Sequence, residues 1–222
     1  MHGIILKIAQ SLPGFLMAIV VHEAAHAWMA NKFGDATAKN DGRLTLNPAA
    51  HYDMWGTIIF PLFAAISGWA MIGWAKPVPV NARNFKNIRS GMFWVSFAGP
   101  LSNIIVGTLS ALLLAIIHTQ FYDWEFANIF VRMLQFSVFI NFILAFFNLI
   151  PLPPLDGSKM VASFLKGPAL FKYEGLARFT PVIFMGALLL SFSGVRTLGY
   201  LLAPAVSIGE YLMISFVSFF GA

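Results

Sequence analysis

Long apolar stretches constrain the fold of this sequence more than any other feature. A helix needs about 20 apolar residues to cross the hydrocarbon core of a bilayer. Five stretches approach or exceed that length, at 4–30, 91–117, 127–150, 179–195 and 197–220. Only 10% of the residues are charged, whereas an ordinary soluble domain carries about 25%. We therefore expect an all-α polytopic membrane protein that contacts lipid and forms a single domain over residues 1–222.

The charged residues and the lack of cysteine narrow the classes of function. The net charge is +5, but Lys and Arg lie in short loops between apolar runs. This pattern is typical of the cytoplasmic face of a membrane protein and not of a nucleic-acid-binding surface. The stretch 4–30 lacks the basic start and the cleavage site of a signal peptide, so we interpret it as a retained first span. Because the sequence contains no Cys, only His, Asp and Glu can hold a metal.

A sixth apolar stretch, 54–75, has two interpretations. Three residues that disfavour a regular helix interrupt it: Pro61, Gly68 and Gly73. The segments on either side of it, 31–53 and 76–90, both carry Lys and Arg. A full span would place these two basic segments on opposite faces of the membrane, against the positive-inside bias. We favour a re-entrant hairpin, and a short, kinked sixth span is the alternative.

The hairpin gives a consistent topology. It places the basic segments 31–53, 76–90 and 157–178 in the cytoplasm, and the acidic segment 118–126 outside. Non-helical backbone at membrane depth must then be buried in protein or line a water-filled cavity. We expect a bundle of about five to six transmembrane helices in the cell membrane. A short strand is predicted at 42–47, where polar and apolar residues alternate between turn formers.

The sequence His22-Glu23-Ala24-Ala25-His26 is the strongest signal of chemistry. Residues four apart on a helix share a face, with Cβ atoms about 5–6 Å apart, so both imidazoles can reach one tetrahedral Zn²⁺. Glu23 is placed beside the first of these ligands to act as a general base. Ionisable residues inside an apolar helix are costly and usually serve a function. We therefore predict one zinc ion per chain, bound by His22 and His26.

A catalytic zinc usually has three protein ligands and a water, so a third ligand is needed. The candidates on the cytoplasmic side of this topology are Asp156, Asp53 and His51. Asp156 follows the stretch 127–150, and three prolines just before it disfavour a helix and allow the chain to bend back. We predict Asp156 as the third ligand. His51 and Asp53 are the alternatives, and we otherwise interpret them as loop or interface residues.

These residues together resemble the site-2 protease family of intramembrane zinc metalloproteases. Members carry His-Glu-x-x-His in one span and a Leu-Asp-Gly ligand motif after a later span, which correspond to His22, Glu23, His26 and Asp156. The stretch from Asn148 to Asp156 is similar to the second motif of the family, in which the Asn contacts substrate. The resemblance therefore implies that Asn148 binds substrate.

Two other segments bear on this resemblance. The stretch 97–103 looks like a family feature, although its small residues would equally allow close packing of helices. The insert 40–90 departs from the family pattern because it widens the gap between the two motifs. The chain is most similar to the compact bacterial or archaeal subgroup.

The resemblance implies an enzyme that hydrolyses peptide bonds of membrane-spanning proteins or peptides within the bilayer. The topology derived from the charges places its active site toward the cytoplasm. Zinc would polarise the scissile carbonyl, and Glu23 would act as the general base. A helical substrate must unwind first, and the strand at 42–47 could hold its extended chain by strand addition. The alternative is a zinc-binding membrane protein or transporter without proteolytic activity. A transporter needs ligands along a path across the bilayer, whereas the ionisable residues here cluster at one depth.

Overall fold

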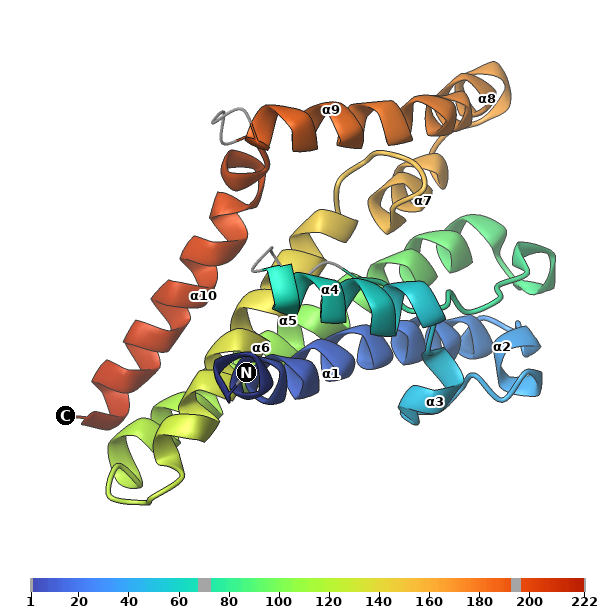
Figure 1. The fold of residues 1–222 in the computed structure, drawn as a ribbon. Helices are drawn as coiled ribbons and strands as arrows, with labels where there is room; N and C mark the ends of the chain where they lie inside the picture. The colour runs from blue at the N-terminus through green and yellow to red at the C-terminus, as the bar shows by residue number, and fades with distance from the viewer. Residues whose placement is uncertain (1, 68–72, 193–196, 222) are drawn as a thin grey trace.

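The fold was analysed in a computed structural model that describes residues 2–67, 73–192 and 197–221. The described part of the chain is built from helices and connecting segments (Figure 1). Four of these helices are long and apolar enough to cross a membrane. They are α1 (His2–Lys32), α5 (Ile88–Gln120), α6 (Ala127–Asn148) and α10 (Thr197–Gly221). The expectation of a polytopic, helical membrane protein is confirmed at this level.

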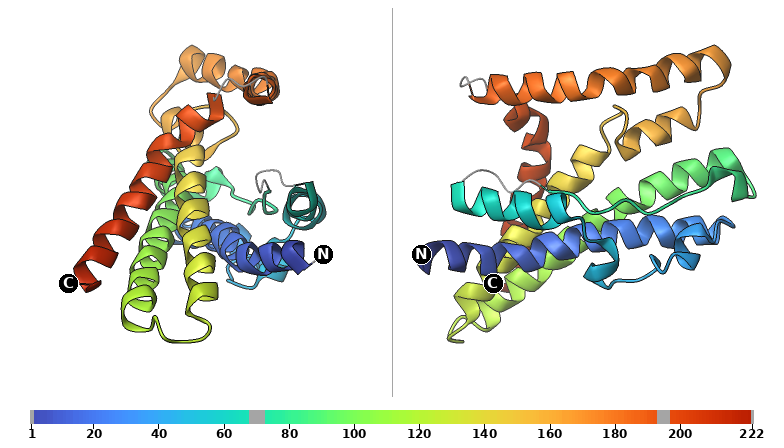
Figure 2. Two further views of the ribbon diagram at one scale, coloured as in Figure 1. Left: turned by 60° about the vertical axis from the view of Figure 1, so that its left-hand side comes forward. Right: turned by 45° about the vertical axis from the view of Figure 1, so that its right-hand side comes forward.

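The centre of the bundle is an antiparallel pair, α5 and α6, joined by the short segment 121–126 (Figure 2). Helix α1 crosses this pair, and its apolar side chains Phe15 and Ile19 pack with Ile140 of α6. Helix α10 packs along the other side, where Ala205 contacts Val138 and Phe142. Small residues let the helices approach closely. A Cβ at Gly14 would lie 3.2 Å from the Cα of Ser137, so only glycine fits this crossing without adjustment.

The insert between α1 and α5 folds against α1 as short elements. These are α2 (Thr37–Asn40), α3 (Pro48–His51), the π-helix η1 (Met54–Ile59), α4 (Phe60–Ser67) and the 3₁₀-helix η2 (Ala82–Asn84). Residues 73–81 have no regular helix and run back along α1; we call this segment the arm (Figure 1). Two backbone hydrogen bonds attach the arm to the start of the insert, from Trp74 N–H to Gly56 O (3.1 Å) and from Lys76 N–H to His51 O (2.9 Å).

The structure forms no strand at 42–47. Turn and bend residues occupy this segment, because the chain folds back at the end of α2, where Arg43 N–H donates to Ala38 O over 2.8 Å. The alternation of polar and apolar residues indicated a strand, but the local turn takes up the backbone groups that a strand would use. The re-entrant hairpin predicted for 54–75 falls partly outside the described residues.

The C-terminal part begins with α7 (Asp156–Ala162), followed by α8 (Gly167–Glu174), the 3₁₀-helix η3 (Gly175–Phe179) and α9 (Thr180–Phe192). The last three form a rod that lies apart from the α5–α6 pair (Figure 2). Two side chains attach the rod to the proline-rich segment before α7: Tyr173 Oη–H donates to Pro151 O over 2.8 Å, and Thr180 Oγ1–H donates to Pro153 O. With 13 residues, α9 is shorter than the roughly 20 that a span needs. Of the rest of the predicted span 179–195, residue 179 lies in η3 and residues 193–195 lie outside the described residues.

Candidate metal centre

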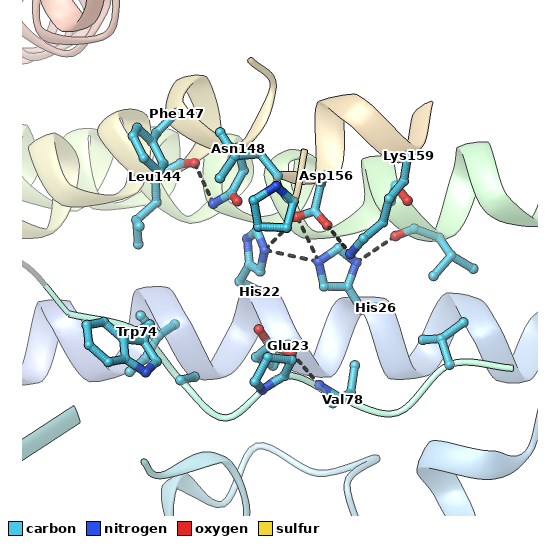
Figure 3. A pocket seen from close by; sticks show the side chains of 18 of the residues that line it. His22, Glu23, His26, Trp74, Val78, Leu144, Phe147, Asn148, Asp156 and Lys159 are labelled. Carbon is cyan, nitrogen blue, oxygen red and sulfur yellow. Dashed lines mark hydrogen bonds and ion pairs between the residues drawn. The ribbon is translucent and has the colours of Figure 1, made fainter. Parts of the chain in front are cut away.

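Helix α1 presents His22 and His26 one turn apart on the same face, as their spacing predicts. Their ring centroids are 4.6 Å apart, and the two Nε2 atoms approach to 3.0 Å. Both side chains are buried, with 7% of each residue exposed. Figure 3 shows the two rings directed away from α1 and toward α7.

Asp156 is the first residue of α7 and completes the group. Its Oδ2 lies 3.1 Å from Nε2 of His22 and 3.1 Å from Nε2 of His26. The prolines after Asn148 end α6, because proline has no N–H to donate and its ring clashes with a continuing helix. Gly157 lets α7 lie directly under the end of α6, since a Cβ there would clash with the carbonyl of Leu149. The fold thus requires a glycine after Asp156 for steric reasons.

Hydrogen bonds at the Nδ1 atoms determine which ring nitrogen of His22 and of His26 carries the hydrogen. Nδ1 of His26 lies 2.6 Å from the carbonyl oxygen of Val95 on α5. A carbonyl only accepts, so Nδ1 carries the hydrogen and Nε2 of His26 presents a lone pair. Nδ1 of His22 lies 2.6 Å from Oδ1 of Asn103, also on α5.

The amide orientation of Asn103 follows from its other neighbours. Its Nδ2 donates to Ala18 O (3.0 Å) and to Oδ1 of Asn141 (2.9 Å), and Nδ2 of Asn141 donates to Ser137 O (2.8 Å). Because the Ala18 carbonyl can only accept, the nitrogen of Asn103 must face it and the oxygen must face His22. His22 therefore also carries its hydrogen on Nδ1 and presents a bare Nε2.

Three acceptor atoms thus meet without a hydrogen between them: two Nε2 atoms and Oδ2 of Asp156, at 3.0–3.1 Å. Such atoms repel one another unless a cation lies among them. Two imidazoles and a carboxylate are a known ligand set of catalytic zinc, and a tetrahedral ion with bonds of about 2.0–2.2 Å separates its ligands by roughly 3.3–3.5 Å. Gly99 of α5 keeps the space open, because a Cβ there would lie 2.5 Å from Nε2 of His26 and 2.6 Å from Nε2 of His22. The residues present fit a zinc ion.

The second oxygen of Asp156 has a different partner. Its Oδ1 accepts from the ammonium of Lys159, one turn further along α7, over 3.1 Å. The positive charge of Lys159 favours the ionised form of this carboxylate. The carboxylate is therefore ionised near neutral pH, as a metal ligand must be.

Glu23 lies beside this group and is directed toward the arm. Its Oε2 accepts from the backbone N–H of Val78 over 2.9 Å (Figure 3). A pocket of about 630 Å³ contains Glu23 and the three candidate ligands. Its lining includes the apolar side chains of Ile19, Trp74, Leu144 and Phe147. The pocket can accept a segment of apolar polypeptide next to a carboxylate base.

The other residues singled out in the sequence lie as follows. Asn148, the last residue of α6, lines the same pocket and donates from Nδ2 to Leu144 O over 3.0 Å. His51 is fully buried away from the pocket lining, with Nε2 2.8 Å from Thr45 O. Asp53 accepts from the N–H groups of Trp55 and Gly56 at the start of η1. The structure thus brings Asp156, and not His51 or Asp53, to the two histidines.

Comparison with known proteins gives a family match and several relatives. The model of peptidase family M50 matches residues 113–188, which include Asn148 and Asp156. The "Putative zinc metalloprotease YwhC" of Bacillus subtilis is 45% identical over 150 residues, which cover 66% of this chain and 64% of that protein. These matches support the resemblance to peptidase family M50, the site-2 protease family.

Two further relatives are more distant. The "Putative zinc metalloprotease Rip2" of Mycolicibacterium smegmatis is 32% identical over 147 residues, and the protein of the same name from Mycobacterium tuberculosis is 33% identical over 147 residues. Each match covers 66% of this chain and 53% of the relative. The chain therefore spans between about half and two thirds of the length of these curated relatives. No solved structure matches it.

Sequence reasoning missed several groups that contact the site, and Asn103 and Val78 illustrate why. Asn103 lies in the stretch 97–103, which the sequence marks as a family feature, but a packing role accounted for it equally well. The signal available was a polar side chain in an apolar span, which is costly unless it has a partner. No side-chain signal could identify Val78, because it contacts Glu23 through its backbone.

Proposed function

We propose that this protein is an intramembrane zinc metalloprotease that hydrolyses peptide bonds of membrane-spanning substrates. The observation that carries the proposal is the meeting of His22, His26 and Asp156 through three bare acceptor atoms, with Glu23 beside them in one pocket. One zinc ion per chain would be held by Nε2 of His22, Nε2 of His26 and Oδ2 of Asp156. The match to the M50 family model and the names of the relatives support this assignment.

The chemistry follows from the positions of the chain's own groups. When bound, zinc supplies a Lewis acid that polarises the scissile carbonyl and makes water more acidic. Glu23 accepts a proton from the attacking water on its free carboxylate oxygen, and the water oxygen forms a bond to the carbonyl carbon. The carbon–nitrogen bond then breaks, and Glu23 passes the same proton to the departing amine. His22 and His26 keep their Nδ1 hydrogens throughout, because Asn103 and Val95 accept them.

The substrate must reach this site as extended chain, because a helix hides its carbonyl groups in backbone hydrogen bonds. The strand first expected at 42–47 is not formed, and the arm is the better candidate for holding the substrate by strand addition. Val80 N–H, on the pocket side of the insert, has no hydrogen-bond partner among the described residues and is free to pair with substrate backbone. Asn148, at the other wall of the pocket, remains our candidate for a side-chain contact with substrate.

We also propose that segment 54–75 enters and leaves the membrane on the same face. Thr57 Oγ1–H donates to Trp74 O over 2.9 Å, and Trp74 N–H donates to Gly56 O over 3.1 Å. These contacts hold the two ends of the segment side by side, whereas a full span would separate them by about 30 Å. With both flanking segments basic, this face is the cytoplasmic one, and the protein resides in the cell membrane with its active site on that side.

Cleavage of a defined reporter tests the function. The reporter is a panel of synthetic peptides, each with an apolar span of about 20 residues interrupted at its centre by Asn-Gly and flanked by lysines, reconstituted with the protein in phosphatidylcholine liposomes. Mass spectrometry should find two fragments with zinc-loaded wild type and none with Glu23→Gln, which keeps the size of the side chain. If zinc-loaded wild type left the whole panel intact while zinc crossed the same liposomes, the transporter alternative would replace this proposal.

A further inference from the structure

The arm has a sequence that predetermines its shape and leaves it few hydrogen-bond donors. Lys76-Pro77-Val78-Pro79 contains two prolines, each with its φ angle fixed and without an N–H. A residue that precedes proline is biased to extended backbone, and this applies to both Lys76 and Val78. The segment is therefore extended before it makes any tertiary contact. Between residues 77 and 79, Val78 alone carries a backbone N–H.

Hydrogen bonds anchor the arm on both sides of Val78. On one side, Lys76 N–H donates to His51 O over 2.9 Å, and the guanidinium of Arg43 donates to Lys76 O. On the other side, Asn81 N–H donates to Oδ2 of Asp35, just after α1, over 2.7 Å. Asp35 lies beyond the end of the helix that carries Glu23, so its bond ties the arm to the region of the active-site helix.

The N–H of Val78, the only backbone donor between residues 77 and 79, meets the carboxylate of Glu23, with 2.9 Å between Val78 N and Oε2. We propose that the Val78 N–H is a positioning group for Glu23, so that the inserted arm forms part of the catalytic site. This inference rests on the proposed function, in which Glu23 is the general base. The N–H occupies one carboxylate oxygen and leaves the other free for the attacking water.

The physical reason lies in the freedom of a glutamate side chain. An unrestrained Glu samples many rotamers, and ordering such a side chain costs free energy. A base acts only within hydrogen-bond reach of the proton that it takes, and a small displacement of a reacting group can cost about 100-fold in rate. A backbone donor on a stiff, doubly anchored segment restricts Glu23 before substrate arrives. The insert thus contributes to the turnover rate, and contributes little to metal binding.

Hydrogen exchange tests the contact without any substrate. Because Pro77 and Pro79 have no N–H, residues 77–80 report only two amides, those of Val78 and Val80. In the intact, zinc-loaded protein we expect the Val78 hydrogen to exchange slowly and the Val80 hydrogen quickly. In Glu23→Ala the slow hydrogen should exchange about 10-fold faster or more, as expected for the loss of a hydrogen bond to a charged group. The Lys76 amide, bonded to His51, is the internal control and should not change.

Kinetics on the reporter panel test the consequence. Val78→Pro removes the N–H, whereas Val78→Ala shortens the same side chain and keeps the N–H, so the difference between the two variants reports the N–H. We expect kcat of Val78→Pro to be about 10- to 100-fold lower than that of Val78→Ala, with similar KM and zinc content in both. Equal kcat in Val78→Pro and Val78→Ala would overturn the inference and leave the proposed function standing.

Two further outcomes distinguish a failure of the proposed function from a failure of this inference. A wild type that cleaves no reporter would count against the proposed function and not against the contact. If Val78→Pro failed to fold or to bind zinc, exchange would decide: a Val78 amide that exchanges equally fast in wild type and in Glu23→Ala would overturn the inference.

Discussion

Oδ1 of Asn103 lies 2.6 Å from Nδ1 of His22, and the two residues come from different helices, α5 and α1. Asn103 is fully buried, and its amide nitrogen is occupied by Ala18 O and by Asn141. If the amide turned over, its oxygen would face Ala18 O and Oδ1 of Asn141, and three acceptors would meet. This contact fixes which nitrogen of His22 is available to a metal.

The first prediction concerns this contact. Asn103→Leu keeps the volume of the side chain but removes the acceptor, so His22 loses the group that orients it. We expect zinc affinity, measured by competition with a chelator, to fall by about 10- to 100-fold, as is typical when the outer partner of a metal-ligating histidine is lost. Ser110→Ala is the control, because Ser110 is also buried but bonds to Ser137 and does not contact His22. Affinity within about twofold of wild type in Asn103→Leu would contradict this role.

The second prediction concerns the space between the ligands. In Gly99→Ala the added methyl group would lie 2.5–2.6 Å from the two Nε2 atoms, which is closer than nonbonded atoms approach. We expect metal analysis to find little or no zinc in this variant. Gly186→Ala is a matched control on α9, where a Cβ would meet nothing within 4 Å. A Gly99→Ala protein with one zinc per chain would place the metal elsewhere.

The third prediction concerns pH and the anchor of the arm. Burial raises the pKa of Asp35. Hydrogen bonds from Thr37, Asn81 and Asn84 together lower it by more, so the pKa lies below its usual value. A carboxylate with a depressed folded-state pKa stabilises the protein above its unfolded pKa of about 3.9, and loses this contribution as the pH falls through the folded value. We expect Asp35→Asn to melt at a lower temperature than wild type at pH 7.

The difference between the two melting temperatures should shrink as the pH falls below about 4. Comparing both proteins at each pH cancels the loss of metal in acid, which affects them alike. A difference that stays constant from neutral to acid pH would mean that the charge of Asp35 does not stabilise the arm.

The fourth prediction concerns membrane topology. The chain contains no native cysteine, so single cysteines can be introduced at exposed positions and labelled with a membrane-impermeant maleimide. Asn40→Cys, Arg83→Cys and Ala169→Cys should react from the cytoplasmic side, and Tyr122→Cys from the opposite side. Positions 40 and 83 flank segment 54–75. If these two labelled from opposite faces, the re-entrant hairpin would be replaced by a full span.

The sequence by itself determined the features that depend on local pattern. Runs of apolar residues predict the long helices α1, α5, α6 and α10, because a span is recognised by its own length and composition. The spacing of His22 and His26 places both rings on one face, because four residues make about one helical turn. The same local logic failed at 42–47, where alternation indicated a strand but a turn formed.

Only the tertiary structure decided which distant groups meet the histidines. The sequence favoured Asp156 as the third ligand and kept His51 and Asp53 as alternatives, and the bend after α6 brings Asp156 to His22 across 134 positions of the chain. Asn103 and Val78 reach the site across 81 and 55 positions. Periodicity carries no information at such separations. These contacts depend instead on how closely α1, α5 and the arm pack, and on the glycine and proline positions that allow that packing.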